Sequence, residues 1–218
     1  ILDKQNDIEI TNVDAELPGS NHGNLSQVKD SDRYNFVKGN ISNKKFMEEQ
    51  ISNCDAVVNF AAESFVDRSI NDANPFLVSN IRGAFTILDI TTKQRKRMVQ
   101  ISTDEVFGSL FEGTANETTR FNPSSPYAAT KAAAELLMNS YSITFNSDVI
   151  ITRCTNNFGP RQFVEKLIPK TIILANHDLK IPIYGKGNNV RDWIFVDDHC
   201  DACLLYTSPS PRDRGWSR

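Results

Sequence analysis

The sequence predicts an α/β protein with a doubly wound parallel sheet, and three observations support this. Short runs rich in β-branched residues alternate with longer runs of helical periodicity, which is the pattern of βαβ units. Several of the short runs are apolar without interruption, as expected for strands buried on both faces. The length of 218 residues suits one domain and part of a second.

The expected elements follow one another in this alternating order. Strands are expected at residues 34–37, 56–60, 98–102, 149–152 and 181–184, and helices at 43–53, 75–92, 125–141 and 165–176. Ser42 is an N-cap candidate for the first helix, and Pro75 opens the second, where proline suits the first turn. The helices would cover both faces of the sheet.

Both ends of the chain depart from the pattern of an intact doubly wound protein. None of the 10 glycines lies in a G-x-G-x-x-G array, so the loop that cradles phosphates is missing from the sequence. Because Ile1-Leu2-Asp3 resembles a strand end followed by an acid, we expect a first strand, glycine turn and helix to precede residue 1. At the other end, periodicity stops after residue 205, and residues 206–218 are expected to be disordered or foreign to the fold.

Composition narrows the choice of partners and compartment. The 24 Lys and Arg against 27 Asp and Glu give a net charge of −3, which provides no electrostatic basis for binding nucleic acid or an anionic membrane. Without a signal peptide or a long apolar run, a cytoplasmic protein is expected, and four scattered cysteines suit a reducing compartment. Cys200 and Cys203 are better explained as one helix face than as metal ligands, so no metal is expected.

Two motifs carry chemistry. Tyr127 and Lys131 are spaced i, i+4 near the start of a helix, so both side chains share one face. A nearby ammonium would lower the phenol pKa and make Tyr127 a usable base, although such pairs alone are common on solvated helix faces. The second motif is a hydrophobic strand that runs directly into Thr103, Asp104 and Glu105. Ligands of doubly wound folds lie at such strand ends, and two adjacent acids there can divide into a proton donor and a proton acceptor.

With these motifs, the sequence resembles the extended short-chain dehydrogenase/reductases, and within them the nucleoside-diphosphate-glucose 4,6-dehydratases of the dTDP-glucose type. The resemblance runs from residue 1 to about residue 205. Its carriers are Leu2-Asp3-Lys4, residues 60–70, residues 102–108, residues 125–131, residues 156–160, residues 165–169 and Arg191-Asp192-Trp193. The order of these blocks is more specific than any single one.

The resemblance implies a Rossmann-type domain with NAD that is reduced and reoxidised within each turnover. It implies dehydration of a nucleoside-diphosphate glucose, with dTDP-glucose converted to its 4-keto-6-deoxy product. Tyr127 would take the C4 hydroxyl proton, assisted by Thr103 and Lys131. Glu105 would then remove the C5 proton, and Asp104 would protonate the departing C6 hydroxyl.

Further site residues are implied in the same way. For the cofactor they are Asp3, Lys4, Asn40, Ile41, Ala61, Ala62, Glu63, Ser79, Asn80, Tyr127, Lys131 and Asn157. For the substrate they are Ser64, Thr103, Asn156, Lys166, Leu167, Pro182, Ile183, Tyr184 and Arg191. The implied organisation is an NAD-binding domain at 1–160 without its first βα unit, a partial nucleotide-sugar-binding region at 161–205, and the tail at 206–218. A homodimer is expected for the family, and without its glycine loop the 218-residue chain itself is expected to be inactive.

Two other functions remain open from the sequence. A nucleotide-sugar 4-epimerase or decarboxylase would use the same cofactor, although epimerases typically carry small hydroxyl residues where Asp104 and Glu105 stand. A non-catalytic sensor of NAD or a nucleotide sugar would not need the full acid–base set. Phe65, Phe107 and Asn40 depart from the usual His, Tyr and Asp, and residues 5–24 are expected to form an unusually long loop after Asp3.

Overall fold

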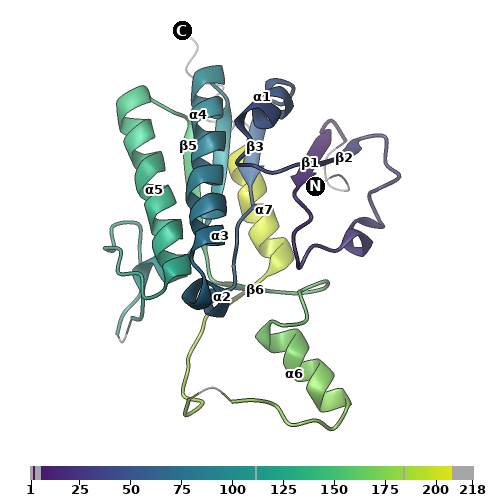
Figure 1. The fold of residues 1–218 in the computed structure, drawn as a ribbon, viewed down its shortest axis with the longest axis vertical. Coiled ribbons are helices and arrows are strands. Elements are labelled where there is room, and N and C mark those ends of the chain that lie inside the picture. The colour runs from purple at the N-terminus through teal and green to yellow at the C-terminus, as the bar shows by residue number, and fades with distance from the viewer. Residues whose placement is uncertain (1, 3–5, 111, 184, 208–218) are drawn as a thin grey trace.

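The structure, a computed structural model, describes residues 2, 6–110, 112–183 and 185–207. Its centre is a parallel sheet in the order β3 (Ala56–Asn59), β4 (Arg97–Thr103), β5 (Val149–Cys154). Six of the seven residues of β4 are buried, because helices cover both faces of this middle strand. The three predicted strands of this sheet are therefore confirmed, and so is the doubly wound α/β class (Figure 1).

Two smaller parallel pairs flank the central sheet. β1 (Ile10–Asp14) pairs with β2 (Tyr34–Lys38), in a register that places Ile10 opposite Tyr34. β6 (Asn156–Phe158) pairs with β7 (Trp193–Phe195). The prediction of a strand at 34–37 is confirmed, whereas β1 lies within residues 5–24, which we had expected to form a loop.

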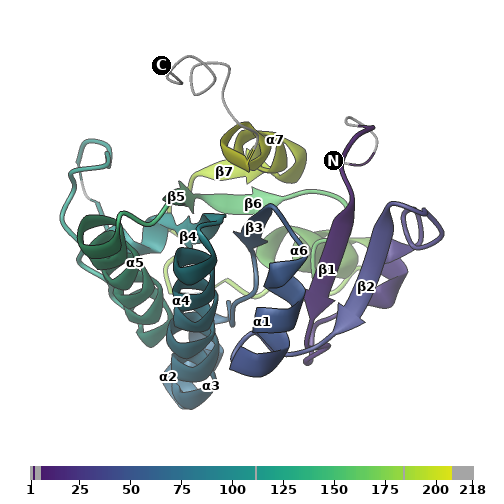
Figure 2. The same cartoon turned by 90° about the horizontal axis from the view of Figure 1, so that it is seen from above.

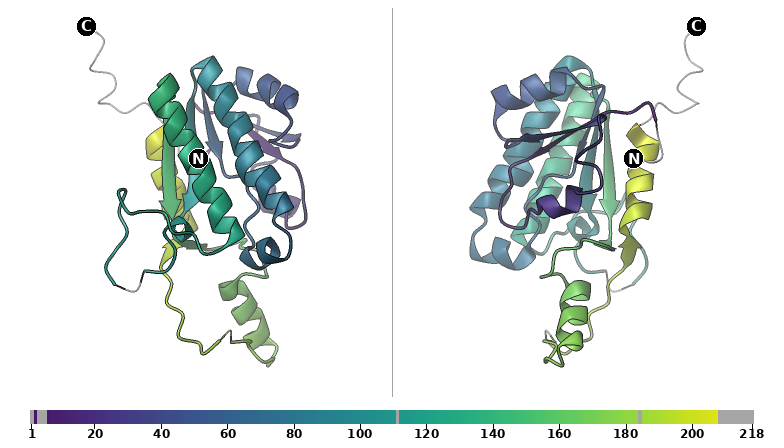
Figure 3. Two further views of the ribbon diagram at one scale, coloured as in Figure 1. Left: turned by 60° about the vertical axis from the view of Figure 1, so that its left-hand side comes forward. Right: turned by 90° about the vertical axis from the view of Figure 1, so that its right-hand side faces the viewer.

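Helices lie on both sides of the sheet, as Figure 2 shows. On one face lie α1 (Lys44–Ser52), α4 (Ala84–Gln94) and α5 (Pro126–Phe145), and on the other lies α7 (Val196–Thr207). α6 (Leu167–Asn176) stands apart from these layers (Figure 3). The short helices are α2 (Val66–Asn71) and α3 (Asn74–Phe76), with a π-helical stretch Leu77–Gly83 leading into α4.

The helix starts show which capping residues act. Asn43, not Ser42, caps α1, because the Asn43 side chain accepts a hydrogen bond from the Phe46 N–H at 3.2 Å. Ser42 instead donates from its own N–H and hydroxyl to the Asn40 side chain. Pro75 lies in the first turn of α3 as predicted. The expected Ser42 cap is wrong because the chain enters the helix one residue later.

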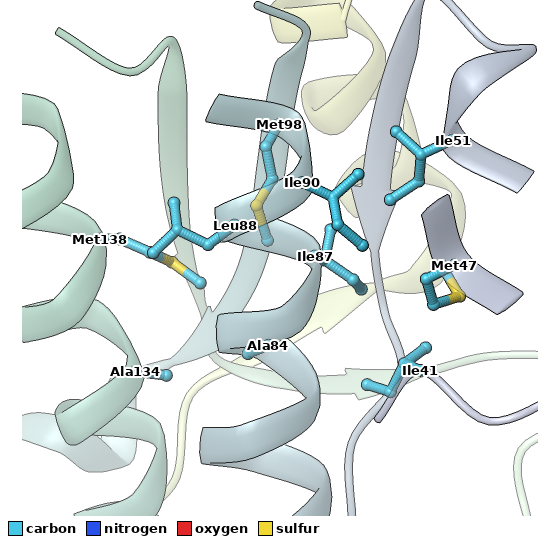
Figure 4. Packing of buried hydrophobic residues seen from close by; sticks show 10 residues of the cluster. All are labelled: Ile41, Met47, Ile51, Ala84, Ile87, Leu88, Ile90, Met98, Ala134 and Met138. Atoms are coloured by element: carbon cyan, nitrogen blue, oxygen red, sulfur yellow. The ribbon is translucent and has the colours of Figure 1, made fainter. Parts of the chain in front are cut away.

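The largest core lies between the sheet and the helices on its α1/α4/α5 face (Figure 4). Its buried members are Ile41, Met47, Ile51, Ala84, Ile87, Leu88, Ile90, Met98, Ala134 and Met138. Gly83 is required where Ile41 meets the π-helical stretch, since a Cβ there would lie 2.6 Å from the Ile41 side chain. Burial of this apolar surface fixes the helices against β4 and thereby fixes the strand's carboxyl end.

Two expectations near the carboxyl terminus are not met. Residues 181–183 form no strand: Pro182 lacks an N–H donor, and no strand of the described chain lies beside this segment. Ile183 is accordingly exposed, and Tyr184 lies outside the described residues. The expected tail begins too early at residue 206, because α7 continues to Thr207, whereas 208–218 lie outside the described residues. No helix in the described ranges has the length and apolar composition to cross a bilayer.

Candidate active site

The Thr103-Asp104-Glu105 turn stands at the carboxyl end of β4. β4 ends at Thr103, and the short helix Asp104–Phe107 begins immediately after it. The Thr103 hydroxyl accepts a hydrogen bond from the Glu105 N–H and donates one to the Asp104 carboxylate, and both donor–acceptor distances are 3.2 Å. Threonine is suited to this capping position, so local backbone chemistry places both carboxyls at the edge of the sheet.

Tyr127 reaches the same edge from α5. Ser125 caps this helix by accepting a hydrogen bond from the Ala128 N–H at 3.1 Å, and Pro126 opens its first turn. The Tyr127 N–H donates to the Ser69 hydroxyl of α2 at 3.1 Å, which fixes the start of α5 against α2. The Tyr127 phenol faces the Thr103 hydroxyl closely enough for that hydroxyl to lower the phenol pKa, and the charges of Asp104 and Glu105 raise it. The structure thus brings together the two motifs that the sequence singled out.

The electrostatics of Tyr127 and Lys131 differ from the expectation. Burial, followed by the charge of Glu105, raises the pKa of Tyr127 above its ordinary value of 10.0. Burial also lowers the pKa of Lys131 to about 8, and its ammonium donates to the Ile101 carbonyl at 2.6 Å. The expected lowering of the phenol pKa by Lys131 is therefore wrong for this structure, because the ammonium is directed to the backbone of β4 and the nearby charges are carboxylates.

The two neighbouring carboxyls, Asp104 and Glu105, both have raised pKa values. Burial raises the pKa of Asp104 and of Glu105, and the charge of Asp104 raises that of Glu105 further. Arg191 lowers both pKa values, and Lys166 lowers that of Glu105 as well. Two neighbouring carboxyls in unequal surroundings can work as one acid and one base.

Two of the predicted substrate residues, Lys166 and Arg191, act on this pair through their charges. Lys166 immediately precedes α6, and its ammonium donates to the Ser64 carbonyl at 3.4 Å. Burial lowers the pKa of Lys166, and the charge of Glu105 opposes this shift. Asn156 is joined to the Asp192 carbonyl through its N–H at 3.3 Å and its side-chain amide at 3.2 Å. Leu167, Pro182, Ile183 and Arg191 are exposed on this side of the chain.

The segment 61–63, predicted to lie under the cofactor, is held by Asn80. Asn80 is buried in the π-helical stretch and accepts from the Glu63 N–H at 2.9 Å. Its amide donates to the Glu63 carbonyl at 3.0 Å and to the Thr130 hydroxyl at 3.1 Å. Ala61 is fixed in turn, because its N–H donates to the Asn59 side chain at 3.2 Å. Ala62 and the neighbouring Ser79 are partly buried. Asn80 therefore joins this segment to α5, one residue before Lys131.

Asn157 has a partner that sequence reasoning missed. The Asn157 side-chain oxygen lies 2.8 Å from Nδ1 of His199 on α7, and its amide donates to the Thr155 carbonyl at 3.1 Å. His199 is buried, and burial lowers its pKa, so the neutral ring is favoured. Its Nε2 is buried without a hydrogen-bond partner among the described residues. The sequence pattern around His199 did not indicate this contact, because His199 and Asn157 meet only in the folded chain.

The adenosine side also contains a missed residue. Asp3 and Lys4 lie outside the described residues, whereas Asp14 is the last residue of β1 and is exposed. In doubly wound folds an acid at such a strand end binds ribose hydroxyls. Asp14 also lines a cavity of about 260 Å³, with Asn12 and His22. The signal was present in the sequence as a five-residue run, Ile10–Asp14, that ends in an acid.

Asn40 and Ile41 follow β2, as the predicted adenine segment requires. Asn40 is exposed, and its side chain already accepts hydrogen bonds from Ser42. Ile41 is 8% exposed and belongs to the main core. Of this pair, the Ile41 side chain is therefore buried in the core, and Asn40 is the residue exposed toward a ligand.

The residues present fit a dinucleotide in two of its three parts. The phenol, hydroxyl and ammonium of Tyr127, Thr103 and Lys131 suit a nicotinamide riboside, and the exposed Asp14 carboxylate suits the adenosine ribose. A glycine-rich turn for the pyrophosphate is not found in the printed sequence. The described residues could therefore contact the nicotinamide riboside and the adenosine ribose of the dinucleotide, but they include no glycine-rich turn for its pyrophosphate.

A parallel sheet with Tyr-x-x-x-Lys and a hydroxyl at its carboxyl edge defines the chain as an extended short-chain dehydrogenase/reductase. The sequence profile described as "GDP-mannose 4,6 dehydratase" matches residues 2–214, and the chain belongs to this family.

Individual relatives agree with this assignment. The chain is 44% identical to the low-salt glycan biosynthesis protein Agl12 of Haloferax volcanii over 93% of this chain and 65% of that protein. It is also 44% identical to a dTDP-glucose 4,6-dehydratase of Streptomyces griseus, over 88% and 59%. The chain thus spans about 60% of the length of these curated relatives.

Solved structures show the same likeness. The dTDP-glucose 4,6-dehydratase DesIV of Streptomyces venezuelae, with NAD and TYD bound, superposes with a TM-score of 0.88 at 40% identity, covering 92% of this chain and 63% of DesIV. A UDP-glucuronic acid 4-epimerase of Bacillus cereus, in complex with UDP-glucuronic acid and NAD, also gives a TM-score of 0.88, at 25% identity, over 94% and 66%.

Proposed function

We propose that the chain is the NAD-binding and catalytic portion of a dTDP-glucose 4,6-dehydratase. The observation that carries this proposal is that Thr103, the Asp104–Glu105 pair and the Tyr127 phenol come together at the carboxyl end of β4, where the charges of both acids act on the phenol. Oxidation at C4 needs a base at the C4 hydroxyl, and elimination across C5 and C6 needs a second base and an acid. These four side chains supply that set.

Each side chain has one role in the proposed reaction. Tyr127, whose phenol pKa is lowered by the neighbouring Thr103 hydroxyl against the raising effect of burial, takes the proton of the C4 hydroxyl. The C5 proton becomes acidic beside the new carbonyl, and Glu105 removes it. Asp104, whose pKa is raised by burial, holds the proton that the departing C6 hydroxyl needs. The charges of Lys166 and Arg191 favour the ionised form of Glu105, which suits its role as the base.

The cofactor of the proposal is NAD, which accepts a hydride and later returns it. Tyr127 and Lys131 would hold its nicotinamide riboside, and the segment 61–63, fixed by Asn80, would lie beneath it. Asp14 would accept hydrogen bonds from the adenosine ribose and would repel the 2′-phosphate of NADP. NAD in solved relatives supports this choice.

The substrate end of the proposal comprises Ser64, Asn156, Leu167, Lys166 and Arg191. Their support is the approach of Lys166 to Ser64 and the action of both cations on Glu105. Cations here would face the diphosphate while the sugar lies over the acid pair.

The domain organisation is proposed as 1–160 for cofactor binding and 161–205 for the start of the nucleotide-sugar region, with the tail starting after α7, which ends at Thr207. The contacts of α7 with β3, β4 and β5 favour moving that helix to the first unit.

A homodimer in the cytoplasm completes the proposal. Exposed apolar side chains on α4 and α5, among them Phe85, Leu136 and Ile143, provide a surface that a second copy could cover. None of the four cysteines forms a disulfide in the described structure, which supports a reducing compartment.

The experiment compares the 218-residue chain with a chimera that adds the amino- and carboxy-terminal segments of the Streptomyces griseus relative. Both are incubated with NAD and dTDP-glucose, and the sugar products are identified. We expect the chimera to release the 4-keto-6-deoxy sugar and the 218-residue chain to be inactive, because the pyrophosphate loop is absent from its sequence. Recovery of intact sugar from an NAD-loaded chimera would refute the dehydratase.

The likeness to a 4-epimerase keeps one alternative under test. An epimerised product without loss of water would favour it, and binding without any turnover would favour a sensor. The acid pair favours the dehydratase, because exchange at C4 needs neither removal of the C5 proton nor protonation of the C6 hydroxyl.

A further inference from the structure

Phe65 is the centre of a small cluster between α2 and the segment before α6. The Lys166 ammonium and the guanidinium carbon of Arg68 each lie 4.2 Å from the centroid of the Phe65 ring. Phe163 meets the same ring edge-on, with centroids 5.7 Å apart. One aromatic ring thus contacts two cations, which are otherwise expected to repel each other.

A carboxylate compensates that repulsion. Arg68 donates to both carboxylate oxygens of Glu165, at 3.1 and 3.2 Å. This pair occupies Arg68 and joins α2 to the residue before Lys166. The charge of Glu165 thus opposes the effect of Arg68 on Lys166, whose ammonium contacts the ring and the Ser64 carbonyl.

The Lys166 ammonium also interacts electrostatically with Glu105. Its charge acts on Glu105, and the charge of Glu105 acts on it in return. A free lysine side chain samples many rotamers, and ordering them opposes ligand binding. Because the Phe65 ring already holds the ammonium in place, much of the entropy cost of ordering the lysine side chain is avoided when a ligand binds.

We propose that Phe65 is a positioning residue: its ring holds the Lys166 ammonium next to the Ser64 carbonyl, ready for the diphosphate of a nucleotide sugar. The proposal rests on the proposed function for the identity of the anion, but the contact between ring and ammonium can be tested without it.

The first experiment is a double-mutant cycle on the 218-residue chain. Urea unfolding is measured for wild type, Phe65→Leu, Lys166→Met and the double variant. A cation–π contact at this partly buried site should give a coupling of about two- to fivefold in the unfolding equilibrium constant. Phe65→Tyr, which keeps an aromatic face, should preserve the coupling. Independent effects of the two substitutions would overturn the proposal.

The second experiment is a calorimetric titration of the chimera, with and without the same substitutions, with dTDP. We expect Phe65→Leu to weaken binding about three- to tenfold and Phe65→Tyr to restore most of it. Phe85→Leu, a matched change on the exposed side of α4, should leave binding unchanged. Phe65→His should bind progressively more weakly as the pH falls below about 6.5, because an imidazolium would repel Lys166.

The outcomes separate the two proposals. A measured coupling with no dTDP binding by any variant would overturn the substrate assignment and leave the contact standing. Equal dTDP affinity in wild type and Phe65→Leu would overturn the role of Phe65 while leaving the dehydratase intact.

Discussion

The ion pair of Glu135 and Arg153 offers the sharpest test of how the site is supported. Glu135 lies one turn after Lys131 on α5, and its side chain is fully buried. One carboxylate oxygen accepts from Arg153 Nε at 2.8 Å and Nη2 at 2.7 Å, and the other accepts from the Ser102 hydroxyl. The pair therefore joins α5 to β4 and β5 directly beneath the catalytic edge.

Arg153→Met removes the cation and keeps an apolar stem. The buried carboxylate would then lose its compensating charge, which costs about 3–5 kcal/mol of unfolding free energy. A domain of this kind is stable by about 5–15 kcal/mol, so the variant should lose a large part of its stability. Glu135→Met together with Arg153→Met should be more stable than Arg153→Met alone, since no charge is left buried.

Urea unfolding followed by circular dichroism measures these differences. Arg97→Met is the matched control, because Arg97 pairs with Asp148 at the surface, where the Asp148 side chain is 51% exposed. An exposed pair contributes at most about 1 kcal/mol. If Arg153→Met lost no more stability than Arg97→Met, the buried pair would not support the site as described.

Four further outcomes are expected. Between about pH 8 and pH 10.5 the unfolded chain holds a proton on Lys131 that the folded chain releases, so stability should rise with pH; unfolding at several pH values should show this rise, about 3 kcal/mol, to be missing in Lys131→Met. Burial lowers the pKa of His199, so the unfolded chain binds a proton more readily than the folded chain and the free energy of unfolding should fall as the pH drops below 6.5. In the same titration, His199→Gln should not show this acid-dependent loss of stability. Ser125→Ala should lower the unfolding free energy by about 1 kcal/mol, because the α5 cap is lost; an unchanged urea midpoint would contradict this. In the chimera, Asp14→Ala should narrow the preference for NAD over NADP, and equal discrimination in a competition titration would speak against a ribose contact.

The central sheet could be predicted because its strands carry their own signal. Each of the three strands 56–59, 97–103 and 149–154 contains consecutive β-branched or other apolar residues, and six of the seven residues of β4 are buried. β1 was missed because Asn12 and Asp14 interrupt its apolar pattern, and a polar cavity lies over that face. The segment 181–183 carried a strand-like pattern, yet β-propensity without a neighbouring strand does not form a sheet.

The site divides in the same way. Thr103, Asp104, Glu105 and Tyr127 could be predicted, because strand ends and helix starts fix their positions locally. The partners that hold the site could not, since they meet only in the folded chain. His199 and Asn157 are 42 positions apart, and the residues joined by the Lys166–Ser64 hydrogen bond are 102 apart.

Glu105→Gln in the chimera tests the division between oxidation and elimination most directly. With dTDP-glucose added, the C4 proton and hydride can still leave, but no carboxylate remains at position 105 to take the C5 proton. We expect NADH absorbance to appear and persist, with no 4-keto-6-deoxy sugar. Release of that sugar at the wild-type rate would contradict Glu105 as the base and the proposed arrangement around it.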